Sequence, residues 1–380
     1  MEGPPPLPPA PPAAPPPLSE APQTQGRTFP CARCGAELTY AIGAAALRCS
    51  YCGYEQPLTV EAGAAVLEHD LQAALSRGAA ARPTADAAPG RQELRCDSCG
   101  ATVVFDGTLT SSACSFCGVP VQRDRVHQAA DRLPVDGVLP FAVEAGQARG
   151  ALASWVKGLW FAPNDFRKRG VDGDLQGVYL PFFTFDAMTS TTYQGQRGEH
   201  YWVTVGSGQN ERREMRTRWY PASGAFQRFF DDVLVPAFRA LPAPLLTQLE
   251  PWPLGGCLPF TPEALAGKLA HTYDVELPPS FQAARERIDG ALREEVEERI
   301  GGDEQRITDL TTGYAALTFK HLLLPVWLLA YRYREKSYRV AINACTGEVH
   351  GERPWSVVKI TFAAILAAVV AALIYTASQQ

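Results

Sequence analysis

Eight of the ten cysteines fall into two sets whose spacing suits metal binding. In the first set, Cys31 and Cys34 are followed after fourteen residues by Cys49 and Cys52. The second set repeats this spacing 65 residues later and consists of Cys96, Cys99, Cys114 and Cys117. Two Cys-x-x-Cys pairs joined by a hairpin-length segment can place four thiolates tetrahedrally around one ion. The sequence therefore predicts two metal ions. Zinc is the expected metal, and iron stays open because it also occupies four-thiolate sites.

The segments around these cysteines are typical of two small zinc ribbons. Each Cys pair is followed by glycine, which permits the tight turn that aims two thiols at one point. We expect the first ribbon over 27–60, with strands near 37–40 and 47–48. The second is expected over 93–122, with a strand at 102–105. Four thiolates leave no open coordination position, and a ribbon buries little apolar surface, so both ions are predicted to be structural.

Two other N-terminal segments have distinctive compositions. Residues 1–26 are rich in proline, which predicts a disordered, solvated tail of polyproline II character. Residues 61–92 connect the ribbons. Apolar residues at helical spacing predict a helix over 61–76, and an Ala/Pro/Gly-rich linker follows it over 79–90.

Residues 131–356 have a different composition, dense in aromatic and β-branched residues, which indicates a mixed α+β domain. Apolar stripes predict helices over 144–160 and 281–300. The segments 180–187 and 324–331 are similar apolar runs that open with Leu-Pro. Each is expected to be a buried strand that starts at its proline. Their similarity suggests a second internal duplication, with two half-domains sharing one sheet. A hairpin is expected over 336–349.

The C-terminal segment 360–377 contains eighteen residues without a charge. At about 1.5 Å per residue, a helix of that length comes close to the roughly 30 Å of a bilayer core. Lys359 and Arg353 precede it and no basic residue follows, which predicts a single-pass anchor with the bulk of the chain on the cytoplasmic side of a bacterial inner membrane. The alternative is a C-terminal helix buried in the globular core.

Charge and cysteine usage bear on the compartment and the partners. The net charge is −5, and residues 27–130 carry nine Lys or Arg against ten Asp or Glu. This region therefore has no positive field to attract nucleic acid. The knuckle spacing, together with the absence of a recognisable secretory signal peptide, favours reduced thiols in the cytoplasm over a disulfide framework.

No catalytic constellation stands out, so whether the protein is an enzyme stays open. The six histidines form no His-Glu-x-x-His pair, and no P-loop is present. Glu199 and His200, with Asp186, are the most suggestive group, although a structural histidine is the preferred interpretation. Asp231 and Asp232 could act as a metal-binding or acid/base pair, but neighbours on a strand point to opposite faces, which favours a turn or capping role.

Six short segments carry a resemblance to a known family. They are 179–186 (YLPFFTFD), 230–235 (FDDVLV), 249–252 (LEPW), 301–307 (GGDEQRI), 322–327 (LLLPVW) and 351–356 (GERPWS). Behind paired ribbons, they resemble a family of bacterial double zinc-ribbon membrane proteins of poorly defined function. Relatives in that family are often labelled as similar to primosomal protein N' (replication factor Y) or superfamily II helicases. Some similar proteins are associated with membrane-stress systems that include SPFH (band-7) and phage-shock-type partners. The resemblance implies the eight cysteine ligands and no catalytic residues.

These observations favour a membrane-anchored cytoplasmic adaptor whose zinc ribbons dock protein partners at the inner membrane. The alternative is a nucleic-acid-binding protein linked to DNA replication, without an ATPase motor of its own. A third possibility is an enzyme with its site in the domain over 131–356, which would need a cleft where His200, Asp186 or Glu199 converge.

Overall fold

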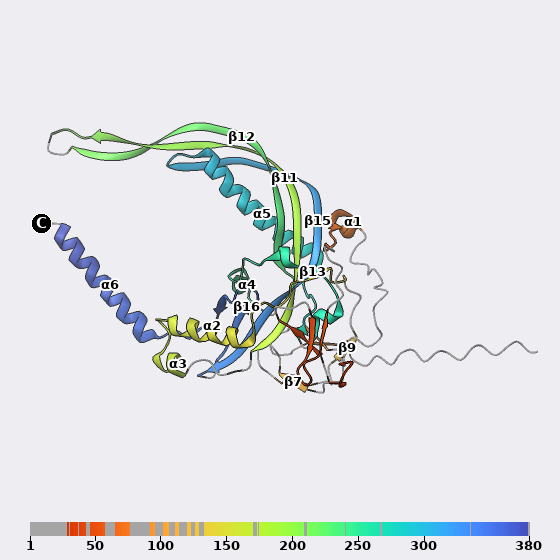
Figure 1. Ribbon diagram of the computed structural model, residues 1–380. Helices are drawn as coiled ribbons and strands as arrows, with labels where there is room; N and C mark the ends of the chain where they lie inside the picture. The colour runs from red at the N-terminus through yellow and green to blue at the C-terminus, as the bar shows by residue number, and fades with distance from the viewer. Residues whose placement is uncertain are drawn as a thin grey trace, which may run out of the picture.

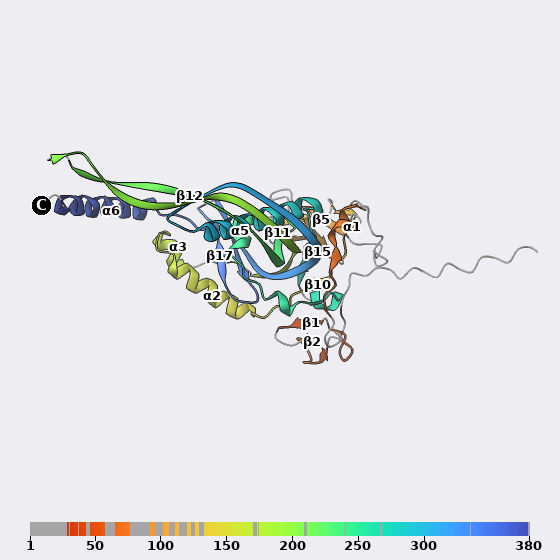
Figure 2. The same ribbon diagram turned by 90° about the horizontal axis from the view of Figure 1, so that it is seen from above.

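The computed structural model describes residues 29, 31–36, 38–42, 46–57, 65–76, 133–169, 173, 175–208, 211–239, 241–266, 268–334 and 336–378. It also describes the backbone of five short strands between residues 92 and 128. The predicted tail over 1–26 and the linker over 79–90 lie outside the described residues. Figures 1 and 2 show the chain in two perpendicular views.

The N-terminal third of the chain contains short elements. They are β1 (Leu38–Ala41), β2 (Ala46–Cys49), β3 (Glu55–Pro57), β4 (His69–Asp70), α1 (Leu71–Ser76), β5 (Gln92–Arg95), β6 (Thr102–Phe105), β7 (Ser111–Ala113), β8 (Pro120–Gln122) and β9 (Val126–Gln128). β1, β2 and β3 form one antiparallel sheet. The expected ribbon strands near 37–40, 47–48 and 102–105 are thereby confirmed.

The rest of the chain contains much longer elements. They are β10 (Gly137–Val138), α2 (Ala145–Gly158), α3 (Asn164–Arg169), β11 (Gln176–Val205), β12 (Arg212–Pro236), α4 (Ala243–Thr247), η3 (Leu254–Gly256), β13 (Leu258–Pro259), η4 (Pro262–Leu265), β14 (Leu269–Ala270), α5 (Leu277–Ile300), β15 (Glu304–Tyr333), β16 (Lys336–Asn343), β17 (Val349–Gly351) and α6 (Val357–Ser378). We call residues 133–351 the body.

A nine-stranded sheet organises the body. Its main order is β12-β11-β15-β10-β13; β14 pairs with β11, β16 and β4 pair with β15, and β17 pairs with β16. β11 and β15 are thirty residues long and run antiparallel to each other. Figure 1 shows β11, β12 and β15 curving out of the body as an arm, with α5 along it. The mixed helix and sheet composition of this region agrees with the α+β prediction.

The body contains two copies of one strand–helix–hairpin unit. The first copy is β10, α2, β11 and β12, and the second is β14, α5, β15 and β16. Corresponding hydrogen bonds recur in both copies: the Leu139 N–H donates to the Leu323 carbonyl at 2.9 Å, and the His271 N–H donates to the Tyr179 carbonyl at 2.9 Å. The short strand of each copy therefore runs parallel to the long strand of the other. The structure therefore shows a repeated topology within one shared sheet, as the predicted duplication requires.

The two Leu-Pro segments lie inside the long strands and do not start them. Pro181 is within β11 and Pro325 is within β15, so that part of the prediction was wrong. The Pro181 carbonyl accepts the Ala237 N–H at 3.0 Å, and the Pro325 carbonyl accepts the Ala344 N–H at 3.1 Å. On that side of each strand the neighbour, β12 or β16, has just ended. A proline fits there because no ladder donor is lost.

Both predicted body helices form, with adjusted ends. α2 begins after the N-cap Glu144, which shares a capping box with Gln147. α5 begins at Leu277, ahead of the predicted start, because prolines suit the first turn of a helix. Its inward stripe is buried as expected and consists of Ala284, Ile288, Leu292, Val296 and Ile300. Gly301, at φ +64°, ends the helix.

The helix predicted over 61–76 is much shorter than expected. Among its described residues, only Leu71–Ser76 are helical, and His69–Asp70 pair with β15 instead. The Asp70 carboxylate accepts the Ala73 N–H at 2.6 Å, which caps the helix at that point. Pairing with the sheet edge therefore overrides the helical spacing upstream. The expected hairpin over 336–349 forms as β16 and β17.

α6 projects away from the body as a single helix (Figures 1 and 2). Within Val357–Ala377, the most apolar window of 18 residues has a mean hydropathy of 2.6, and none of that window is buried against the rest of the chain. The alternative of a helix buried in the core is therefore wrong. Its 21 residues would extend about 32 Å, enough to cross a bilayer core. α6 is the candidate membrane helix in the part of the chain that the structure describes.

Candidate metal centre

Two matching turns carry the first four cysteines. In the first turn, the Gly35 N–H donates to the Cys31 carbonyl at 2.8 Å; in the second, the Gly53 N–H donates to the Cys49 carbonyl at 3.0 Å. Gly35 and Gly53 have φ values of +74° and +70°, a region that favours glycine. The glycines noted in the sequence therefore have the expected role, and β1 and β2 set the two turns against each other.

The four sulfur atoms converge on one point. Cys31 Sγ lies 3.6 Å from Cys52 Sγ, and Cys34 Sγ lies 3.5 Å from Cys49 Sγ. All four thiols lie within 4.8 Å of one another. These separations far exceed a disulfide bond of about 2.05 Å. They approach the spacing of roughly 3.8 Å expected when four thiolates surround one ion at about 2.3 Å. The donor set therefore fits a tetrahedral metal ion.

A small apolar core surrounds this centre. Cys31 and Cys49 are buried together with Leu38, Tyr40 and Leu47. The core is completed by Ala266 of the body, whose carbonyl accepts the Tyr40 N–H at 3.1 Å. The ribbon is therefore fixed to the body beside η4.

The thiols influence one another's protonation. The Cys52 N–H is the largest influence on Cys49 and lowers the pKa of its thiol to about 7. For Cys34, the Ala36 N–H lowers the pKa, but partial burial and the neighbouring thiols outweigh it and raise the pKa to about 12. Four thiolates gathered this closely need a cation to balance their charge.

The second set of predicted ligands lies outside the described residues. It consists of Cys96, Cys99, Cys114 and Cys117. Around these positions the structure describes the backbone of β5 and β6, which pair antiparallel, and of β7 and β8, which also pair. The remaining cysteines, Cys257 and Cys345, are half-buried thiols, and burial raises the pKa of each to about 12.

The most suggestive group in the sequence does not come together. Asp186 and His200 lie on the same strand, β11, with fourteen residue steps between them, which is roughly 48 Å of strand length at about 3.4 Å per residue. His200 Nε2 instead lies 2.8 Å from Glu304 Oε1, and Glu199 pairs with Arg197 at 2.8 Å. The hydrogen bond from His200 is the main reason why the pKa of Glu304 is lowered. The cleft required by the enzyme hypothesis is absent at these residues, and His200 has the structural role that we preferred.

Asp231 and Asp232 belong to an acidic cluster, contrary to the expectation that strand alternation would point them to opposite faces. A β-bulge places Asp231 and Asp232 together opposite Asp186, so the three carboxylates lie within 4.8 Å of one another. The alternation of neighbours is broken because Asp232 has a φ of +51°. Burial raises the pKa of Asp186, although its carboxylate accepts the Asp232 N–H and the Thr318 hydroxyl. Lys320 Nζ lies 2.8 Å from Asp232 Oδ1, so an ammonium group already offsets the negative charge of the cluster.

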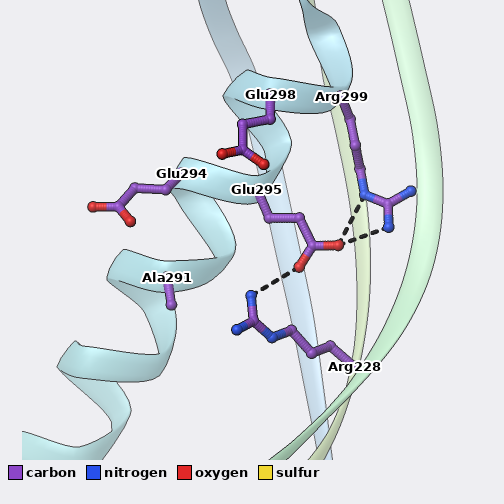
Figure 3. Close-up of a pocket in the computed structure, with 6 residues that line it drawn as sticks. All are labelled: Arg228, Ala291, Glu294, Glu295, Glu298 and Arg299. Carbon is purple, nitrogen blue, oxygen red and sulfur yellow. Dashed lines mark hydrogen bonds and ion pairs between the residues drawn. The ribbon is translucent and has the colours of Figure 1, made fainter.

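A shallow pocket between α5 and β12 contains a satisfied ion-pair network. It is lined by Arg228, Ala291, Glu294, Glu295, Glu298 and Arg299. Figure 3 shows Glu295 directed between the two arginines, with Glu294 pointing away from them. The Glu295 carboxylate lies 2.6 Å from Arg299 and 3.0 Å from Arg228. The Arg299 hydrogen bond is the main reason why the pKa of Glu295 is lowered. This network ties α5 to the arm.

Comparison with known proteins gives one similarity. The chain is 24% identical over 338 residues to the uncharacterized protein YdjG of Bacillus subtilis strain 168. The aligned region covers 87% of this chain and 90% of that protein. No protein-family model matches the chain, and no solved structure matches it. The similarity therefore spans most of the chain.

Proposed function

We propose that this protein is a membrane-anchored adaptor whose zinc ribbons dock a protein partner at the bacterial inner membrane. The main support is that the first ribbon is fixed to the body on one side and exposed on the other. Tyr40 and Ala266 join it to the body, whereas Tyr51, within a Cys knuckle, is 85% exposed. An exposed aromatic on a rigid turn is a suitable anchor for a partner surface.

Two structural zinc ions belong to this proposal. The first is held by Cys31, Cys34, Cys49 and Cys52, whose sulfur separations suit zinc. The repeated spacing extends the assignment to Cys96, Cys99, Cys114 and Cys117. With four thiolates each, neither ion has an open position for catalysis, so both support docking surfaces.

Membrane attachment through α6 completes the adaptor. Lys359 and Arg353 lie at its N-terminal end, which favours a cytoplasmic location for ribbons and body. The family resemblance suggests a membrane-stress protein of the SPFH or phage-shock type as the partner.

Affinity capture from membranes solubilised in mild detergent tests the adaptor role. The wild-type chain is compared with Cys31→Ser/Cys34→Ser, with Tyr51→Ala, and with Leu67→Ala as an exposed control outside the ribbon. We expect an SPFH or phage-shock-type protein to co-purify with the wild type and Leu67→Ala, weakly with Tyr51→Ala, and not with the double cysteine variant. Equal recovery with all four chains would reject docking by this ribbon.

One observation favours nucleic-acid binding as a second candidate, linked to replication and without an ATPase motor. The last β11–β15 pair is Gly198 with Glu304, so residues 199–218 continue as a two-stranded hairpin beyond the sheet. This hairpin carries four arginines against three glutamates, with an exposed Trp202. Glu214 pairs with Arg212 and Arg216, which leaves Arg213 and Arg218 outside these ion pairs. Arginines combined with an exposed aromatic can bind single strands. Gel retardation at low salt, lost in Arg213→Ala/Arg216→Ala, would support this candidate; no retardation would reject it.

A further inference from the structure

The chain turns sharply between α2 and α3, directly beside the start of α6. We call residues 159–163 the α2–α3 corner. The Phe161 carbonyl accepts the Ser356 N–H at 2.8 Å. Lys359 Nζ lies 2.9 Å from the carbonyl oxygens of both Trp160 and Ala162. The corner is therefore bonded to the residues through which the chain enters α6.

Large aromatic side chains of this region face solvent. Trp160 is 71% exposed, Phe161 38% and Trp355 54%. The rings of Phe161 and Trp355 lie 6.4 Å apart, so they form one patch. Adjacent aromatic side chains on a water-soluble surface are unfavourable and mark an interaction site.

The exposure of this patch does not result from a poorly packed loop. Leu159 and Ala162, on either side of the exposed pair, are buried, and so is Phe166 of α3. Phe166 stacks on Tyr331 of the sheet, with ring centroids 5.5 Å apart. The body therefore holds the backbone of the corner in place while Trp160 and Phe161 point outward.

Basic groups accompany the aromatic patch. The Arg353 guanidinium lies 4.5 Å from the centre of the Trp355 ring. Arg167 donates to the Lys157 carbonyl at 2.6 Å, which places two more cations at the ends of α2 and α3. Tryptophan next to Lys and Arg is typical of the boundary between water and hydrocarbon, where the indole occupies the headgroup level and the cations contact phosphates.

We propose that the α2–α3 corner and Trp355 lie in the headgroup region of the bilayer that α6 enters. This inference rests on the proposed anchoring by α6. The corner is a second, shallow membrane contact that fixes the body against the bilayer, in addition to the single helix. An anionic headgroup is the ligand that its cations suit.

Tryptophan quenching by lipid tests this contact in the full-length protein. The protein is reconstituted in phosphatidylcholine vesicles, with or without phosphatidylglycerol, whose acyl chains are brominated near the headgroup. The chain has seven tryptophans; Trp252 and Trp327 are buried, and Trp202 is exposed in the hairpin of β11 and β12. The variants are Trp160→Phe/Trp355→Phe and, as the matched control, Trp202→Phe.

We expect the double variant to lose at least half of the quenching and Trp202→Phe to lose none, with stronger quenching when phosphatidylglycerol is present. Quenching that persists in the double variant, or that disappears in Trp202→Phe, would overturn the proposal. Absence of quenching at Trp160 and Trp355, as expected if a second copy of the chain covered the corner, would also overturn the proposal. Flotation with the vesicles after alkaline carbonate treatment reports α6 insertion separately. A protein that floats but is not quenched disproves the corner contact alone, whereas one that does not float disproves the anchoring.

Discussion

The first ribbon and the body stabilise their folds by different means. The ribbon core has six buried residues, two of which are cysteines of the candidate metal centre and one of which, Ala266, belongs to the body. The body has several large apolar clusters in which no metal ligand takes part, centred on β11 and β15. Burying a leucine contributes about 1.5–3 kcal/mol, so the few apolar residues of the ribbon cannot order it alone. The comparison leads us to propose that the ribbon depends on a bound metal ion, whereas the body depends on packing.

Metal removal should give the largest effect and separate the two regions. A structural zinc contributes roughly 10–16 kcal/mol to such a site at neutral pH, so a strong chelator should unfold the ribbon while the body stays folded. Hydrogen exchange should become fast in β1 and β2 and stay slow in β11 and β15. Unchanged protection of β1 and β2 in the chelator would show that the ribbon does not need a metal.

Truncation in the body should affect packing in both duplicated units. Leu180 and Leu324 face each other across the central strand pair, and both are fully buried. Leu180→Ala and Leu324→Ala should each cost about 2–5 kcal/mol in urea unfolding of the detergent-solubilised protein. Metal content should not change. The exposed control Leu67→Ala should cost under about 0.5 kcal/mol. A loss of metal from either body variant would contradict the claim that the ribbon and the body are stabilised independently.

Alanine at selected glycines should give smaller effects, with opposite signs in the two regions. A Cβ at Gly35 or Gly53 would meet no atom within 4 Å, so the cost comes only from their positive φ. Gly35→Ala and Gly53→Ala should each cost about 1–2 kcal/mol, measured as weaker metal retention in chelator competition. Gly146→Ala and Gly150→Ala in α2, also without nearby atoms, should stabilise the body by about 0.5–1 kcal/mol. If all four changes act in the same direction, the backbone explanation is wrong.

The smallest expected effect is a pH dependence confined to the body. The folded-state pKa of Glu295 is lowered, chiefly by Arg299 and also by Arg228. Its stabilisation should therefore be complete above the ordinary carboxyl pKa of about 4.3 and lost as the pH falls through the lower folded value. Because this network is partly solvated, Glu295→Gln should cost only about 0.5–1 kcal/mol at pH 7. The difference between variant and wild type should vanish near pH 3; a difference that grows on acidification would contradict the assignment.

The ribbon could be predicted from the sequence almost completely because metal ligands tolerate no replacement. The spacing within each Cys-x-x-Cys pair and the glycine after it indicate the two turns, and the hairpin of β1 and β2 brings these turns together. The duplication of the body left only a trace, the Leu-Pro of 180–181 and 324–325. Apolar packing accepts many side chains, so the two units can share corresponding hydrogen bonds with little similarity in sequence.

The remaining errors came from backbone geometry that side-chain patterns do not encode. Strand alternation predicted that Asp231 and Asp232 point to opposite faces. The structure instead has a bulge at Asp232, which places both residues opposite Asp186. The helix predicted over 61–76 from apolar spacing was too long, because that spacing does not indicate that His69 pairs with β15. The α2–α3 corner also escaped the sequence analysis; the signal that could have found it is the Trp160-Phe161 pair beside a helix break.

The metal content of the purified full-length protein tests the account most directly. Elemental analysis should give two zinc ions per chain for the wild type. Cys31→Ser/Cys34→Ser and Cys96→Ser/Cys99→Ser should each retain one, and Cys257→Ser should retain both. Iron in place of zinc, or a wild-type content that neither double variant lowers, would contradict the assignment of two independent zinc ribbons.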